Sequence, residues 1–160
     1  MSENRYVSFT GHRDADPETA LPLLEDTVED LINHGAETFV AGGAAGFDTL
    51  AAETVLRIRE NYPWVSLVMV LPCPPEEQSR SFTAEMKQRY SAILASADRT
   101  ECIAAHYYNG CMKARNQRLV DLADICVCWY DEAEHASSGT GQTVRMAQKK
   151  GITVINLFKG

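Results

Sequence analysis

Short runs of apolar residues alternate along the whole chain with segments whose apolar residues recur every three or four positions. The runs have the length of buried strands, and the other spacing is that of helices with one buried face. Val65–Leu71 is apolar almost throughout, which is typical of a strand covered on both faces. The predicted strands are Tyr6–Thr10, Thr38–Ala41, Val65–Leu71, Glu101–Ala104, Ile125–Trp129 and Ile152–Leu157.

A helix is predicted in each interval between these strands. The first begins at Asp16-Pro17-Glu18, where a capping residue, a first-position proline and a first-turn acid coincide. The others are predicted from about Gly46, around Phe82–Leu94, around Met112–Ala123 and over Thr143–Lys149. Such alternation favours a parallel sheet with right-handed crossovers. We therefore expect an α/β protein, a Rossmann-like three-layer sandwich with a mostly parallel sheet and helices on both faces.

The chain has 160 residues, of which 45% are hydrophobic, and this is enough for one domain with its own core. No internal repeat or long linker divides it, so residues 1–160 are expected to form a single domain. The segment beginning at Cys73-Pro74-Pro75 is the least regular one. We expect it to pass over the edge of the sheet as a loop.

Acidic residues outnumber basic ones, and the formal net charge is −7. This balance gives no global attraction to nucleic acid or to an anionic membrane, although it leaves room for a local basic pocket. The first residues contain no apolar stretch typical of a signal peptide, and the apolar run around Leu67–Leu71 is too short to span a bilayer. We expect a cytoplasmic protein.

Five cysteines, an odd number, in a chain without a secretion signal are expected to be reduced thiols. Cys126 and Cys128 form a C-x-C pair inside a predicted strand, but no further ligands stand at the spacing of a zinc site. Buried thiols are therefore the favoured interpretation, and no metal site is expected.

Small or glycine-rich segments follow three of the predicted strands, the last of them starting at Ser137. Ligands of parallel α/β sheets bind outside the carboxyl ends of the strands, so these segments are expected to meet at one edge. Glycine lets the backbone approach a ligand closely, and helix N-termini offer unpaired N–H groups to an anion. The candidate ligand-binding residues there are Gly11, His12, Arg13, Gly42, Gly43, Gly46, Asp48, Ser138, Gly139, Thr140 and Gly141.

The side chains among these segments favour a phosphate ligand. Arg13 and Arg115 can donate paired hydrogen bonds to phosphate oxygens, and the hydroxyls of Ser138 and Thr140 add donors. Asn116 adjoins Arg115 in a polar run that either faces solvent or points into the ligand cleft. Both residues belong to the candidate site in the second case.

Other candidate residues allow more than one role. Asp48 either stabilises the first turn of its helix or accepts a hydrogen bond from a ligand hydroxyl, as ribose-binding acids do. His12 is expected to be a polar lining group, because no acid–base partner follows from its spacing. Tyr107 and Tyr108 either stack on a base or pack against the protein.

Several of these residues stand in a specific arrangement: Gly11-His12-Arg13, Gly42–Glu53 (GGAAGFDTLAAE), Pro72 with Gln78, Arg115-Asn116 before Asp121 and Asp124, and Ser138-Gly139-Thr140. These features cover nearly the whole chain. In them the chain resembles the YpsA-like proteins, which were first classed as a domain of unknown function within the SLOG superfamily. The resemblance implies a Rossmann-like pocket for a nucleotide-derived ligand such as ADP-ribose. The superfamily also contains cytokinin-activating phosphoribohydrolases and the single-strand-binding DNA-processing protein A.

Two positions depart from the patterns of these relatives. Ser138 stands where the third loop usually has glycine, and Arg145 aligns with the glutamate of the phosphoribohydrolase motif. Hydrolysis would need Asp48 or Glu53 to replace that glutamate. We therefore expect binding or sensing of a nucleotide-derived phosphate ligand, with no catalytic residue or resident cofactor identified. Cleavage of an N-glycosidic bond is the alternative, single-stranded DNA binding is less favoured, and a homo-oligomer is left open.

Overall fold

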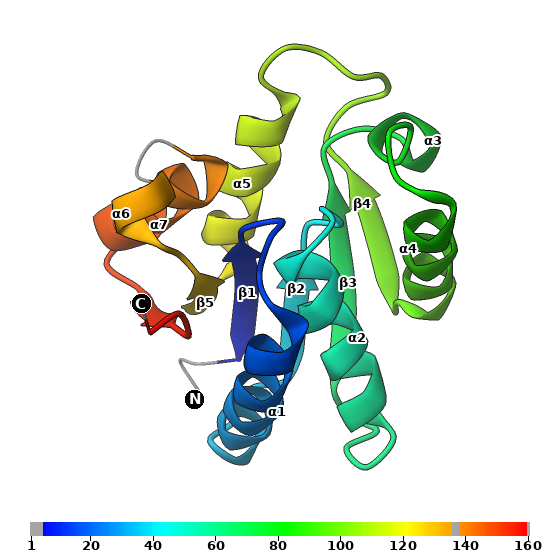
Figure 1. Cartoon of the computed structure of the whole chain (residues 1–160). Helices are drawn as coiled ribbons and strands as arrows, with labels where there is room; N and C mark the ends of the chain where they lie inside the picture. Colours follow the sequence, from blue (N-terminus) through cyan, green and yellow to red (C-terminus); the bar gives the residue numbers. More distant parts are fainter. Residues whose placement is uncertain (1–4, 136–137, 160) are drawn as a thin grey trace.

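Six parallel strands form the sheet of this computed structural model, which describes residues 5–135 and 138–159. Across the sheet their order is β4-β3-β2-β1-β5-β6 (Figure 1). The chain adds strands on one side of β1 as far as β4 and then returns to its other side, so the winding reverses between β1 and β5. The strands are β1 (Tyr6–Gly11), β2 (Thr38–Ala41), β3 (Ser66–Leu71), β4 (Arg99–Cys102), β5 (Ile125–Trp129) and β6 (Thr153–Asn156).

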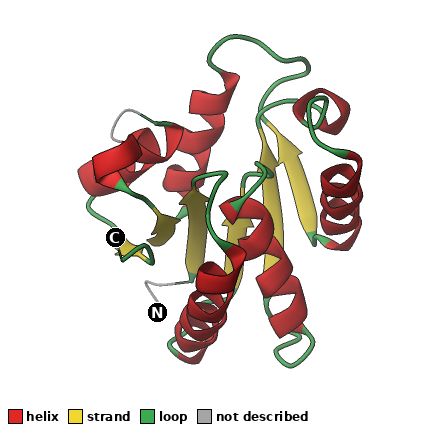
Figure 2. Ribbon diagram, viewed as in Figure 1, coloured by secondary structure: helices red, strands yellow, loops and turns green. Residues whose placement is uncertain are grey.

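Helices cover both faces of the sheet (Figures 1 and 2). They are α1 (Pro17–Asn33), α2 (Phe47–Arg59), α3 (Pro75–Gln78), α4 (Ala84–Ser96), α5 (Cys111–Leu122), α6 (Glu132–His135) and α7 (Gly139–Lys150). The helices α1 and α2 pack together on one face with α4 beside α2, whereas α5 and α7 pack together on the other. The expected α/β three-layer architecture is confirmed. Within the described residues, none of the helices is long and apolar enough to cross a membrane.

Apolar side chains fill both interfaces between sheet and helices. Below α1 and α2, the ring centroid of Phe9 lies 5.9 Å from that of Phe39 and 6.4 Å from that of Phe47. On the other face, Cys126 and Cys128 pack against α7 as part of the core. All five cysteines are free in this structure, and four of them are buried.

Several elements differ from the sequence prediction at their ends, and two of these differences have a clear physical reason. The strand β4 lies over Arg99–Cys102 rather than Glu101–Ala104, because it is an exposed edge strand without an apolar run to mark it. The helix α7 begins at Gly139, inside the predicted loop, because Oγ of Ser138 caps it by accepting a hydrogen bond from the backbone N of Gly141 at 3.1 Å. Much of that glycine-rich segment is therefore the first turn of a helix.

The segment after β3 contains a short helix where a loop was expected. Pro75 occupies the first position of α3, where a missing N–H costs nothing. From the end of this helix, Nε2 of Gln78 donates a hydrogen bond to the carbonyl oxygen of Gly42 at 2.9 Å. The segment thus packs onto the connection between β2 and α2 at the carboxyl edge of the sheet.

Candidate functional site

A cavity of about 320 Å³ opens at the carboxyl edge of the sheet, where β1 and β5 are neighbours. This is the point of reversed winding, at which the connections leave toward opposite faces and a crevice forms between them. The connection after β1, the start of α2, the middle of α5 and the first turn of α7 surround it. The fold therefore places the cavity where α/β proteins of this kind bind ligands.

Nine of the predicted site residues line this cavity: Gly11, His12, Arg13, Asp48, Arg115, Asn116, Ser138, Gly139 and Thr140. Thr10, Ala44 and Met112 line it as well and were not predicted. Thr10 and Ala44 directly adjoin or lie within predicted segments. Met112 precedes Arg115 by three positions on α5, so the i, i+3 relation was the available signal.

Four predicted residues do not line the cavity: Gly42, Gly43, Gly46 and Gly141. The carbonyl oxygen of Gly42 accepts a hydrogen bond from Nη1 of Arg115, and a Cβ on this glycine would lie 2.6 Å from that nitrogen. Gly46 has φ of +90°, and a Cβ there would collide with the backbone of Arg13. These two glycines hold the cavity wall in shape, because only a residue without Cβ allows such close approach.

Asp48 lies in the first turn of α2 and is 5% exposed. Its Oδ2 accepts a hydrogen bond from the backbone N of Ala44 at 3.4 Å, whereas its buried Oδ1 accepts none from the described residues. Burial raises the pKa of Asp48 to about 6, although the charge of Arg115 and the Ala44 hydrogen bond act to lower it. A buried oxygen without a donor is costly, so it marks a position where a ligand donor would be stabilising.

Arg115 is buried in the middle of α5 with its guanidinium held on two sides. Its Nε donates to Oδ1 of Asn116 at 2.8 Å, and its Nη1 donates to the carbonyl oxygen of Gly42. Burial lowers the pKa of Arg115, and the negative charge of Asp48 raises it. Arg115 and Asn116 therefore do not face solvent, although Gln117 and Asp121 of the same polar run do, and Arg115 contributes a fixed positive charge to the cavity.

Arg13 and His12 follow β1 directly. Arg13 is exposed, and its side chain makes no hydrogen bond or ion pair with the residues that the structure describes. His12 is buried, and its Nε2 lies 3.0 Å from the backbone N of Asp131, which donates to it. The neutral ring of His12 therefore carries its proton on Nδ1.

The first turn of α7 contributes Ser138, Gly139 and Thr140 to the wall of the cavity. The first N–H groups of a helix lack partners within the helix, and the dipole of the helix adds positive potential there. Ser137, the start of this predicted segment, lies outside the described residues. The turn thus presents a surface suited to an anion.

The carboxylates proposed as replacements for the hydrolase glutamate differ in their placement. Glu53 is engaged by Arg89, whose Nη2 and Nε lie 2.6 and 2.9 Å from its two oxygens. Arg145 lies at a different cavity, beside β5 and β6. Among the described residues Asp48 is the one carboxylate that lines the candidate site, and none of their His, Cys, Asp and Glu side chains form a group of three suited to a metal.

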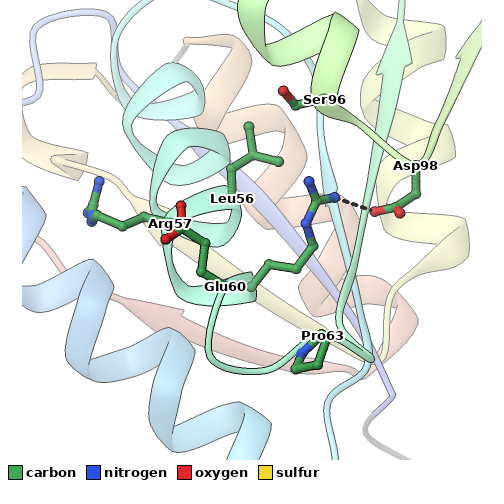
Figure 3. A pocket seen from close by; sticks show the side chains of 7 residues that line it. Leu56, Arg57, Glu60, Pro63, Ser96 and Asp98 are labelled. Atoms are coloured by element: carbon green, nitrogen blue, oxygen red, sulfur yellow. Dashed lines mark hydrogen bonds and ion pairs between the residues drawn. The ribbon is translucent and has the colours of Figure 1, made fainter.

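A larger cavity, of about 490 Å³, lies where α2 ends and β3 and β4 begin (Figure 3). Two of its charged groups pair with each other: Oδ2 of Asp98 accepts hydrogen bonds from Nη1 of Arg59 and from the backbone N of Leu67, both at 2.8 Å. None of the predicted site residues lines it. We therefore treat the cavity at the carboxyl edge as the candidate site.

Comparison with known proteins adds relatives of the whole fold. A family model described as the YspA SLOG family (YpsA) matches residues 9–157. A UPF0398 protein of Shouchella clausii is 32% identical over 117 residues, and one of Halalkalibacterium halodurans is 29% identical over 116. Each match covers 71% of this chain but 61% and 60% of the relative, so the chain spans about three fifths of their length.

One solved structure is similar in fold. DNA processing protein A from Helicobacter pylori, described for its single-stranded DNA binding mode, superimposes with a TM-score of 0.67. The match covers 94% of this chain and 63% of that one, at 22% sequence identity. At this identity the similarity supports the fold.

Proposed function

The chain belongs to the YspA SLOG family, and on that premise we propose that it binds a small nucleotide-derived molecule at the carboxyl-edge cavity. In this proposal a ribose hydroxyl meets Asp48, and a phosphate group lies between Arg13 and the first turn of α7. The cavity volume of about 320 Å³ agrees with a ligand of this size, since small-molecule sites occupy roughly 300–1,000 Å³.

The unpartnered Oδ1 of Asp48 carries the proposal. An ionised carboxylate only accepts hydrogen bonds, so its ligand group must be a donor, and ribose hydroxyls are donors. A phosphate is excluded from this position by repulsion between like charges. It is favoured near Arg13, whose side chain has no partner among the described residues, and at the start of α7.

Calorimetric titration with ADP-ribose tests this assignment. We expect Asp48→Asn to weaken binding roughly 10- to 150-fold, because a hydrogen bond to a charged group contributes about 1.5–3 kcal/mol. An analogue lacking the contacted ribose hydroxyl should bind the wild-type protein as weakly as ADP-ribose binds the variant. Asp16→Asn, which changes an acid outside the cavity, is the matched control and should leave affinity unchanged. Absence of wild-type binding to both ADP-ribose and AMP would overturn the proposal.

Cleavage of an N-glycosidic bond is the second candidate, and the pKa of Asp48 near 6 favours it. A carboxyl group with such a pKa can exchange a proton near neutral pH, as a general acid or base does. Chromatography of AMP incubated with the protein would separate adenine and ribose 5-phosphate, the products of water addition across the bond. Release that is lost in Asp48→Asn would establish the enzyme; we expect none, because no second carboxylate among the described residues lines the cavity.

Single-stranded DNA binding has support from the fold of the Helicobacter pylori protein. Proteins of that class combine a positive groove with stacking aromatic residues. Here the cavity contains two arginines and one carboxylate, and the whole chain has a net charge of −7. The charge distribution therefore favours the small-molecule ligand.

A further inference from the structure

Exposed apolar side chains lie close together in the chain at the start of α5, a helix that borders the candidate site. Of the four exposed large apolar residues in the described part of the chain, three lie between positions 107 and 112: Tyr107 (59% exposed), Tyr108 (48%) and Met112 (37%). We call these three residues the aromatic rim. They lie on the connection from β4 to α5 and the first turn of α5, and Figure 1 shows this connection arching above the carboxyl ends of the strands.

The backbone of the rim is held in place although its rings are exposed. Oε1 of Glu77, on α3, accepts a hydrogen bond from the backbone N of Tyr107 at 2.8 Å, and Oε2 lies 3.2 Å from Nδ1 of His106. The Tyr107 hydrogen bond is the main cause that lowers the pKa of Glu77, so the anchoring group is ionised. At the other end the backbone N of Cys111 donates to the carbonyl oxygen of Tyr108 at 3.1 Å. A fixed backbone lowers the entropic cost of binding on these rings.

One residue of the rim, Met112, also belongs to the polar cavity. This side chain lines the cavity, one helical turn before Arg115 on the same face of α5. A ligand that places its phosphate and sugar among the polar groups therefore meets the exposed side chain of Met112, and the exposed surface of Tyr107 and Tyr108 lies on the segment that leads into this turn of α5. Such surface binds a flat, apolar ring face, with the soft thioether of Met112 suited to the ring edge.

We propose that the aromatic rim is a base subsite: the ligand carries a purine or pyrimidine base that stacks on Tyr107 or Tyr108 against Met112. This assignment rests on the proposed function and adds the chemical class of the group outside the cavity. A nucleotide satisfies all three surfaces at once, with phosphate at α7, ribose at Asp48 and base at the rim. A sugar phosphate without a base satisfies only the first two.

The test compares AMP with ribose 5-phosphate by calorimetry, on the wild-type protein and on Tyr107→Ala, Tyr108→Ala and the double variant. We expect the double variant, and one single variant, to bind AMP roughly 5- to 150-fold more weakly, the range for loss of one base–aromatic stack. Binding of ribose 5-phosphate should stay unchanged, and replacement by phenylalanine should keep AMP affinity. Trp64→Ala is the matched control, because Trp64 is equally exposed (59%) but precedes β3 at the opposite edge.

Each other outcome has a distinct meaning. If the variants weaken AMP and ribose 5-phosphate equally, or weaken neither, the rim is not a base subsite while the phosphate–ribose site stands. If the wild-type protein binds none of AMP, ribose 5-phosphate and ADP-ribose, the proposed function fails and the base subsite fails with it. If the variants lose affinity only for oligothymidylate, while dTMP does not bind the wild-type protein, the rim serves single-stranded DNA and the small-molecule proposal is overturned. Melting temperatures equal to wild type should accompany the tyrosine variants, because the replaced side chains are exposed.

Discussion

The carboxylate of Asp48 and the guanidinium of Arg115 lie in the same cavity, and each favours the ionised form of the other. Burial has the opposite effect and is the larger cause at both residues, so the pKa of Asp48 stays raised and that of Arg115 lowered. Arg115 has further hydrogen-bond acceptors in Asn116 and Gly42, whereas one oxygen of Asp48 has no donor among the described residues. The pair therefore leaves acceptor capacity for a ligand and makes the site sensitive to pH.

Asp48→Asn should change how stability depends on pH. The pKa of Asp48 is about 6 in the folded protein against 3.8 as its ordinary value, so the folded state holds this proton more tightly. The contribution of Asp48 to the free energy of unfolding is then fully present below pH 4 and falls by about 3 kcal/mol as pH rises through 6. Asparagine cannot titrate. The free energy of unfolding of the variant, relative to that of the wild type, should therefore rise by that amount between pH 4 and 7. Urea unfolding at several pH values measures it, and a constant difference across this range would contradict the assigned pKa.

Gly46→Ala should destabilise the protein more than Gly151→Ala. Both glycines have positive φ, +90° and +88°. Gly151 lies in the left-handed region, and a Cβ added there would meet open space. Alanine at this position should therefore lower the free energy of unfolding by about 1 kcal/mol. At Gly46 ψ is −126° and a Cβ would meet the Arg13 backbone, so strain of about 1–3 kcal/mol is joined by displacement of that loop. Equal losses in urea unfolding would show that the two loops do not need this close contact.

Much of the fold could be predicted from local patterns. The bounds of β2 and β5 agree with the predicted Thr38–Ala41 and Ile125–Trp129, because buried strands carry apolar runs bordered by glycine or polar residues. Strand–helix alternation then determined the parallel sheet, and the rule for carboxyl edges located the cavity. The exposed edge strand β4 lacks such a run, so its bounds were predicted two residues too late.

The candidate site was predictable by segment but not by role. The glycine segments did not indicate that the carbonyl oxygen of Gly42 accepts hydrogen bonds from Arg115 and Gln78, because these contacts join residues far apart in sequence. The start of α7 at Gly139, capped by Ser138, could not be predicted, because serine and the glycines after it are typical of loops. Likewise, the burial of Asp48 depends on packing between two loops, which no spacing in the sequence records.

Cys102 should be the one thiol that reacts rapidly in the native protein, because it is exposed and the other four are buried. Burial raises the pKa of Cys126 to about 11 and also raises the pKa of Cys128, Cys73 and Cys102, so exposure rather than acidity distinguishes Cys102. N-ethylmaleimide labelling at pH 8 followed by mass spectrometry should give one early adduct, absent in Cys102→Ser. All five thiols should react once the chain is denatured. Rapid native labelling at Cys126 or Cys128 would contradict the packing of β5 against α7.

Single-stranded DNA should bind weakly at physiological salt. Affinity for a polyanion depends on the number of phosphates neutralised, and log K falls with log salt with a slope of about −0.7 per phosphate. The cavity provides two arginines, one of them already bonded to Gly42 and Asn116, within a chain of net charge −7. Fluorescence anisotropy with oligothymidylate should therefore give a dissociation constant no tighter than roughly 100 μM. Tight binding that weakens steeply with salt would favour the DNA hypothesis.

Arg13→Ala should weaken ADP-ribose binding roughly 10- to 150-fold with almost no loss of stability. The guanidinium has no partner among the described residues, so its removal breaks no contact within them, and an exposed substitution of this kind changes stability by about 0.5 kcal/mol or less. The loss of affinity follows from a charge-assisted hydrogen bond to phosphate. Arg13→Lys should recover part of it, because lysine keeps the charge without the paired geometry.

Arg57→Ala is the control that distinguishes a direct contact between Arg13 and phosphate from a general effect of positive charge. Arg57 is a half-exposed arginine at the cavity of Figure 3, so both variants remove one positive charge from the surface. If Arg13 binds phosphate directly, calorimetry should show loss of affinity in Arg13→Ala alone, and the difference should persist at raised salt because a direct contact is screened less than a distant charge. Equal losses in the two variants, both disappearing with salt, would mean that Arg13 only contributes to the field around the protein. The phosphate position between Arg13 and α7 would then be wrong.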